Sequence, residues 1–277
     1  MKLRVVELLL VTTLPALVLA QNGIPPVGLS IATIIGGTLA AGSANAFNMV
    51  IESETDKLMK RTAQRPIATG IISRSQATLF ATAVGLISLL VFWIFTTPLA
   101  TLLTLIAILF YVLIYTMALK RRTSQNIVWG GIAGCMPVLI GWAAVTNQLS
   151  NVAWAFFFVI FFWTPPHFWA LAIKYKDDYN AAGIPMLPGV TSQKNLHGQM
   201  WFHTIAMYLA SIATIDFARL ANWVQAINAF LFAVFAYELV QLRGSNPDYG
   251  KVAAKVFQWS ITYLSLFSVL LVAAVLI

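Results

Sequence analysis

Three acidic and four basic side chains crowd into residues 48–66, directly after a long apolar stretch. Asn48, Glu52 and Asp56 recur at every fourth residue, so a helix continued through them would place their oxygen atoms on one face. A face of oxygen ligands suits Mg²⁺, which binds a few protein carboxylates together with substrate phosphates. The lysine and arginine residues just beyond the acids can bind a diphosphate. Because the helix before them is apolar, the segment predicts a prenyl diphosphate site.

Further polar residues come from two other parts of the chain. The second acidic loop carries Asp177 and Asp178, and Gly183 and Pro185 soon after them predict the end of a helix. These acids are candidates for catalysis, with simple helix-end charges as the alternative. The candidates for contact with the diphosphate are Lys60, Arg61, Arg65, Lys120, Arg121 and Lys174. The basic group that begins at Lys120 could equally anchor its loop to anionic lipid.

Composition indicates an integral membrane protein, because 60% of the residues are hydrophobic and 9% are charged. Long apolar runs predict an all-α bundle of nine transmembrane helices in a single domain, residues 1–277, and argue against an outer-membrane barrel. The predicted spans are 5–21, 29–49, 77–96, 98–118, 126–146, 152–173, 201–217, 221–241 and 256–276. The single cysteine, Cys135, lies inside one of these spans and excludes an internal disulfide.

Basic residues follow the second, fourth, sixth and eighth spans, whereas Arg219 alone falls on the other side. The positive-inside rule therefore predicts a cytoplasmic N-terminus and an outside C-terminus. The net charge of +8 is explained by this topology, and no nucleic-acid partner is expected. The first twenty residues also resemble a secretory signal peptide, but a retained first helix is the simpler interpretation.

Four stretches together resemble the UbiA-type intramembrane prenyltransferases, in the branch that farnesylates haem. Residues 48–66 resemble the first aspartate-rich motif of that family, and residues 8–15 its opening helix. Residues 163–172, which include His167, resemble its sixth span, and residues 177–188 its second acidic loop. The similarity covers nearly the whole chain.

The resemblance implies that the protein condenses farnesyl diphosphate with a vinyl group of haem B, giving haem O. It implies Mg²⁺ as cofactor, held by Asn48, Glu52, Asp56 and Asp178. His167 is a candidate haem contact, although a buried histidine that bonds a backbone carbonyl freed by Pro165 and Pro166 is the alternative. The lipid bilayer of a bacterial plasma membrane is the expected location, and a downstream haem-modifying oxidase is a possible partner.

The chain departs from the family pattern at Glu52 and Glu54, where relatives generally carry aspartate. An added methylene moves a carboxylate outward by roughly an ångström, and Mg²⁺ tolerates little distortion of its ligand shell. Three other functions stay open: the same fold with a quinone-precursor or chlorin acceptor, a transporter, and a structural subunit of an oxidase assembly. A transporter should carry ionisable residues at mid-membrane, whereas here the acids gather at one mouth of the bundle.

Overall fold

The computed structural model describes residues 3–60, 62–243 and 248–277, and within these residues the chain is helical, with no strand. The elements are α1 (Leu3–Gln21), α2 (Val27–Ile51), α3 (Ser53–Asp56), α4 (Arg74–Phe95), α5 (Pro98–Leu109), η1 (Phe110–Leu119), α6 (Asn126–Thr146), α7 (Asn151–Lys174), α8 (Lys176–Ala181), α9 (Leu187–Val190), α10 (Gln193–Phe217), α11 (Asn222–Gln241) and α12 (Tyr249–Leu276). The element η1 is a π-helix that continues α5.

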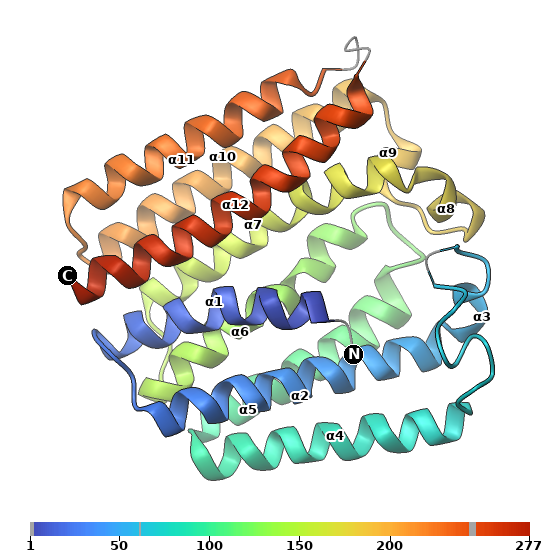
Figure 1. Cartoon of the computed structure of the whole chain (residues 1–277), viewed down its shortest axis with the longest axis horizontal. Helices are drawn as coiled ribbons and strands as arrows, with labels where there is room; N and C mark the ends of the chain where they lie inside the picture. The colour runs from blue at the N-terminus through green and yellow to red at the C-terminus, as the bar shows by residue number, and fades with distance from the viewer. Residues whose placement is uncertain (1–2, 61, 244–247) are drawn as a thin grey trace.

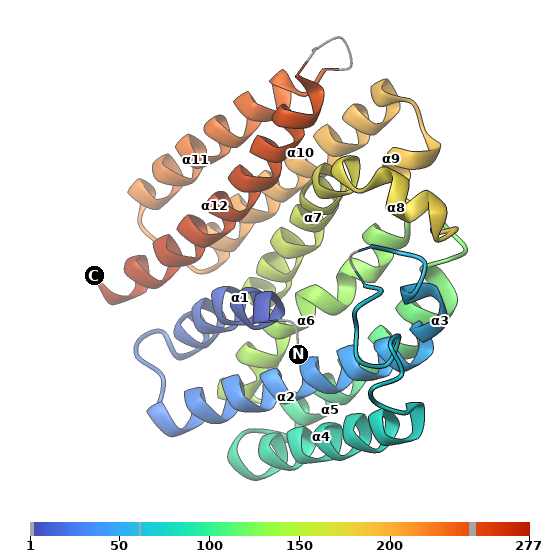
Figure 2. The same cartoon turned by 45° about the vertical axis from the view of Figure 1, so that its right-hand side comes forward.

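The long helices lie side by side and run across the molecule in roughly the same direction (Figure 1). Helix α7 packs against α6, α10 and α12, while α2 packs against α4. Side chains of α7 such as Phe156, Ile160 and Trp169 are almost fully buried, so this helix forms the middle of the core. The short helices α3 and α8 lie at the same end of the bundle in both views (Figures 1 and 2).

Seven helices in the described part of the chain are long and apolar enough to cross a membrane: α2, α4, α5 with η1, α6, α7, α11 and α12. Their bounds agree closely with the predicted spans, apart from α12, which begins at Tyr249 rather than near residue 256. The predicted seventh span, 201–217, lies within α10, which begins earlier, at Gln193. Helices α1 and α10 are not among the seven, and the count of nine spans therefore stays a prediction.

Small residues let the helices approach closely where α2 meets α4. A Cβ atom added at Gly36 would lie 2.8 Å from the Phe92 ring. The Ser88 hydroxyl donates to the Gly36 carbonyl oxygen at 2.7 Å, and the Ser43 hydroxyl donates to Ala81 O at 2.7 Å. Close backbone approach with such hydrogen bonds is typical of helix packing in membranes, where polar groups find no water.

The π-helical register of η1 was not predicted from sequence. Within it the Thr116 hydroxyl donates to Tyr111 O at 2.9 Å, and the Lys120 amide donates to Tyr115 O at 3.0 Å. The backbone bond of Lys120 spans five residues rather than four, which widens the turn and changes the direction in which the next side chains point. On α6, Gly130 makes room for the Tyr115 ring, because a Cβ there would overlap it. The end of η1 is therefore held close to α6.

Candidate functional site

The first acidic motif lies on one nearly continuous helical face. Helix α2 ends at Ile51, yet the Glu52 amide donates to Asn48 O at 2.9 Å and the Asp56 amide to Glu52 O at 2.8 Å. The four-residue hydrogen-bond spacing thus continues from Asn48 to Asp56, as the sequence pattern predicts. All three side chains are buried, with exposed fractions of 2%, 3% and 1% for Asn48, Glu52 and Asp56.

Each buried acid forms an ion pair with a base from another part of the chain. The Arg65 Nη1 atom lies 2.6 Å from Asp56 Oδ2, and the Lys120 Nζ atom lies 2.6 Å from the Glu52 carboxylate. Isolated charges cannot be buried at low cost, so each buried carboxylate needs the cation that faces it. The structure therefore brings together Glu52, Asp56, Arg65 and Lys120, all of which the sequence marked as candidates.

Lys120 lies just beyond the end of η1 and reaches back into the site. Burial lowers the pKa of its ammonium group, and the neighbouring Glu52 carboxylate offsets part of this effect by raising the same pKa. Arg121, the next residue, donates to the Thr55 hydroxyl between the two acids. The end of η1 therefore places two cations, Lys120 and Arg121, beside the first acidic motif.

Asn48 is held by the π-helix itself. Its side-chain amide nitrogen donates to the Thr116 hydroxyl at 3.2 Å. This hydrogen bond does not involve the amide oxygen, which is the atom that could bind a metal ion. Thr116 is buried, and its own proton goes to the Tyr111 carbonyl. Thr116 was not predicted, because its place beside Asn48 depends on the π-helical turn.

The residues present fit a magnesium ion. Asp56 Oδ1 is buried and has no hydrogen-bond partner among the described residues, so it is an acceptor that a cation could satisfy. It shares its helical face with the amide of Asn48 and the carboxylate of Glu52, which supply the hard oxygen ligands that Mg²⁺ prefers. Glu54, by contrast, is exposed and pairs with Lys57 at 2.8 Å and Arg74 at 2.7 Å. The hydrogen bond and charge of Lys57, with Arg74, hold the pKa of Glu54 below its usual range.

The second acidic loop lies at the same end of the bundle but stays apart from the first motif. Asp177 is exposed and Asp178 half-buried on α8, and neither takes part in an ion pair among those found in the described residues. Across the same residues, no group of three or more histidine, cysteine or acidic side chains could hold a metal. Ligation by Asp178 beside Glu52 and Asp56 therefore requires α8 to move toward α3.

The remaining candidate bases are not gathered at the buried acids. Lys60 is exposed, and Lys174 is exposed with its ammonium 5.6 Å from the centre of the Tyr175 ring. Arg61 lies outside the described residues. Flexible lysines at the mouth of a site can still attract an anion, but no contact in the structure assigns that role.

His167 is buried inside the second half of the bundle. Its Nδ1 atom lies 2.7 Å from Ser260 Oγ on α12, so its partner is a hydroxyl rather than the proline-freed carbonyl expected as the alternative. The ring lies between Trp163 and Phe257, at centroid distances of 4.2 and 4.6 Å. Because the Ser260 hydroxyl proton is donated to Phe257 O at 2.6 Å, the bond to Ser260 requires a proton on Nδ1 and leaves Nε2 as the acceptor nitrogen.

Asn126 is a site residue that the sequence analysis missed. It is fully buried at the start of α6, and its side-chain amide lies within hydrogen-bond distance of the carbonyl oxygens of Lys120, Thr123 and Pro185, at 3.4, 2.8 and 3.3 Å. It thereby connects the loop of Lys120 to the loop that follows α8. An asparagine at a helix start also has the ordinary role of a cap, so its type alone gives no signal for this bridge.

Replacing Asn126 by alanine is expected to lower the kcat of the expected prenyl transfer about tenfold. It should also lower the free energy of unfolding by about 2 kcal/mol, since buried carbonyl oxygens lose their donor. Turnover and thermal unfolding of the purified protein measure the two effects. Asn126→Asp keeps the size but removes the amide donor, and should also be impaired. Wild-type turnover in both variants would exclude a positioning role.

The fold and the site together define a multi-pass α-helical membrane protein with a buried cluster of paired acids and bases at one end. Residues 9–275 match the UbiA prenyltransferase family. The chain therefore belongs to the UbiA prenyltransferase family. It is 46% identical over 273 residues to a protoheme IX farnesyltransferase of Renibacterium salmoninarum, covering 98% of this chain and 86% of that protein. It is 47% identical over 274 residues to one of Paenarthrobacter aurescens, covering 98% and 85%.

Solved structures share the fold at low sequence identity. A UbiA homologue from Archaeoglobus fulgidus bound to DMAPP and Mg²⁺ aligns with a TM-score of 0.71 at 15% identity, covering 95% of this chain and 98% of that one. A UbiA homologue from Aeropyrum pernix in its apo form also has a TM-score of 0.71, at 16% identity, covering 98% and 96%. These likenesses establish the fold of the bundle.

Proposed function

We propose that this protein transfers the farnesyl group of farnesyl diphosphate to a vinyl group of haem B, with addition of water, giving haem O and diphosphate. The observation that carries the proposal is the cluster of two buried acid–base pairs on the Asn48, Glu52 and Asp56 face. The support for haem as acceptor is the name shared by relatives 46% and 47% identical over almost the whole chain.

The basic residues of the cluster supply what loss of diphosphate requires. When the allylic C–O bond breaks, negative charge grows on the leaving oxygens, and cations aimed at that position stabilise the transition state more than the ground state. Arg65, Lys120 and Arg121 already reach the cluster and can turn from their present partners toward phosphate oxygens. The surrounding apolar helices exclude water from the electrophile until the vinyl carbon has attacked it.

Asn48, Glu52 and Asp56 are the residues that would hold Mg²⁺, and Asp178 would join them if α8 closes over the mouth. The ion supplies charge neutralisation of the diphosphate as it leaves. Asp177 lies on α8, Lys174 at the end of α7 and Lys60 on the loop after α3. These three residues and Arg61, which lies outside the described residues, remain proposed substrate contacts. His167 remains a proposed haem contact, with Nε2 as the nitrogen available to it.

The proposed membrane arrangement follows from the basic loops. We infer nine spans, a cytoplasmic N-terminus and an outside C-terminus in a bacterial plasma membrane, which puts the acidic cluster at the cytoplasmic face. Association with a haem-modifying oxidase that takes up haem O is a further part of the proposal. Cysteine accessibility labelling on both sides of the membrane tests the orientation.

The deciding experiment incubates the purified protein in detergent with haem B, farnesyl diphosphate and Mg²⁺, beside a sample containing EDTA. Mass spectrometry should find haem O in the first sample and none in the second. If folded protein makes no haem O but prenylates an aromatic acceptor from a panel, the acceptor assignment is wrong and the prenyltransferase class stands.

Arg65→Ala is expected to raise the KM for farnesyl diphosphate about tenfold while changing the KM for haem less than twofold, because the guanidinium contacts the leaving group. Arg74→Ala is the matched control, since Arg74 is exposed and pairs with the outward-facing Glu54. Initial rates with each substrate varied in turn separate the two constants. A change in the haem constant alone would instead assign Arg65 to the haem propionates.

A further inference from the structure

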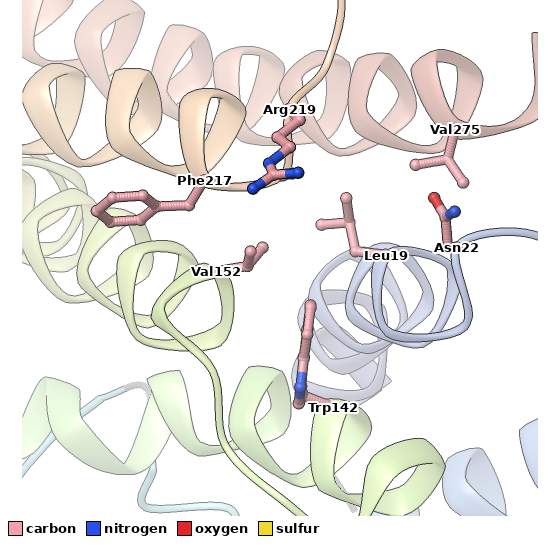
Figure 3. Close-up of a pocket in the computed structure, with 8 residues that line it drawn as sticks. Leu19, Asn22, Trp142, Val152, Phe217, Arg219 and Val275 are labelled. Atoms are coloured by element: carbon pink, nitrogen blue, oxygen red, sulfur yellow. The ribbon is translucent and has the colours of Figure 1, made fainter.

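A hollow of about 400 Å³ opens at the end of the bundle opposite to α3 and α8. It lies where α1 and α10 end and α7 begins, and Figure 3 shows the side chains around it. Six of its eight lining residues are apolar, among them Leu19, Trp142, Val152 and Val275. The acidic cluster and the hollow are therefore separated by the length of the bundle, and the proposed reaction does not use this space.

Two polar side chains enter the hollow from different helix ends. Figure 3 shows the Arg219 guanidinium pointing into it from the end of α10, with the Asn22 amide at the facing rim beyond α1. The side chain of Arg219 has no ion pair or hydrogen bond with any residue that the structure describes. The nearby Asp216 accepts instead from Gln225 at 2.9 Å. Arg219 is exposed, so its unpaired guanidinium at the opening of the hollow is accessible to an anion from outside.

The backbone places both residues in the same uncommon conformation. Asn22 has φ of 52° and Arg219 has φ of 54°, in the left-handed region where helices commonly end on glycine. Asparagine tolerates this region, whereas a long side chain such as that of Arg219 does so less readily. A cation thus occupies a position at which glycine would terminate α10 with less strain.

We propose that the hollow binds the phosphate of an anionic phospholipid. Arg219 donates to the phosphate oxygens through its planar fork of N–H groups, and the Asn22 amide donates from the facing rim. The apolar lining residues, among them Leu19, Val152 and Val275, hold the start of an acyl chain. A lipid fits better than free phosphate because the hollow is bordered by membrane-crossing helices at their ends, where headgroups lie, and because most of its lining residues are apolar.

Native mass spectrometry of the delipidated full-length protein, titrated with phosphatidylglycerol or phosphatidylcholine, tests this site. The wild type should retain one phosphatidylglycerol about tenfold more tightly than Arg219→Gln does, as expected for loss of a charge-assisted contact. Phosphatidylcholine should show no dependence on Arg219. Arg243→Gln is the matched control, because it removes an exposed arginine at the opposite end of the bundle and should bind like the wild type.

A second variant, Arg219→Gly, relieves the left-handed backbone, so it should fold at least as well as the wild type and still lose the lipid. Equal binding by the wild type, Arg219→Gln and Arg219→Gly would overturn the site. Equal losses in the Arg219→Gln and Arg243→Gln variants would show general surface attraction and also overturn it. Inorganic phosphate that displaces the lipid at low millimolar concentration, with the same dependence on Arg219, would assign the hollow to free phosphate. These readouts are independent of prenyl transfer.

Discussion

Replacing Asp56 by alanine is expected to abolish prenyl transfer, with a loss of at least about 10³-fold, because it removes the buried oxygen proposed to bind Mg²⁺ and the partner of Arg65 together. Asp56→Asn keeps the shape and one acceptor for Arg65 but removes the charge, so it should be nearly as inactive while remaining folded. Haem O formation by each variant is measured at saturating substrates, with thermal unfolding in detergent as the test of folding.

Glu54→Ala is the matched control for Asp56. Both are acids of the same motif, but Glu54 is exposed and forms surface ion pairs, which contribute little stability. This variant should keep most of the wild-type rate. Activity of Asp56→Asn within threefold of the wild type, or equal losses in the Asp56 and Glu54 variants, would refute the assignment of the metal face.

The second large effect is expected at Lys120. Lys120→Gln should lower kcat by about 10² to 10³-fold, as observed when a preorganised donor to a developing negative charge is removed. Lys120→Arg keeps the charge in a different shape and should keep part of the rate. Rates measured at several farnesyl diphosphate concentrations separate an effect on turnover from one on binding.

Removing Lys120 also leaves Glu52 as a buried unpaired acid, so a structural explanation must be tested. The double variant Glu52→Gln/Lys120→Gln removes the pair together, and it should recover stability without recovering activity. Arg122→Gln removes an exposed cation two residues along the chain and should leave the rate within twofold. Recovery of activity in the double variant would show that Lys120 acts only by neutralising Glu52.

Most of the fold could be predicted from sequence because the lipid environment selects long apolar helices. The predicted second and fifth spans, 29–49 and 126–146, agree with α2 and α6 to within about two residues at each end. The fourth predicted span is half α-helix and half π-helix, and no local pattern marks that change. Widening of a turn depends on tertiary packing, here the fit of Tyr115 against Gly130.

The acids of the site followed from their spacing, since a period of four residues places them on one face. The partners did not follow, because the pairing of Glu52 with Lys120 joins residues 68 positions apart. Asn126 and Thr116 could not be predicted as site residues either, because Thr116 contacts Asn48 and Asn126 contacts Pro185, both distant in the sequence. Hydroxyl and amide side chains are common in membrane helices, and only the contacts of the folded chain distinguish a bridge from an ordinary cap.

The two buried ion pairs also determine how charge enters this site. Each of the two pairs joins one carboxylate to one cation before any substrate arrives, so the paired groups carry no net charge into the apolar bundle. A diphosphate accompanied by its metal ion likewise brings both signs of charge at once. Binding is then an exchange of partners: the carboxylates leave Arg65 and Lys120 and bind the metal ion, and Arg65 and Lys120 bind the phosphate oxygens. Neither free metal nor free diphosphate can complete that exchange alone. The protein should therefore bind the two together far more tightly than either one separately.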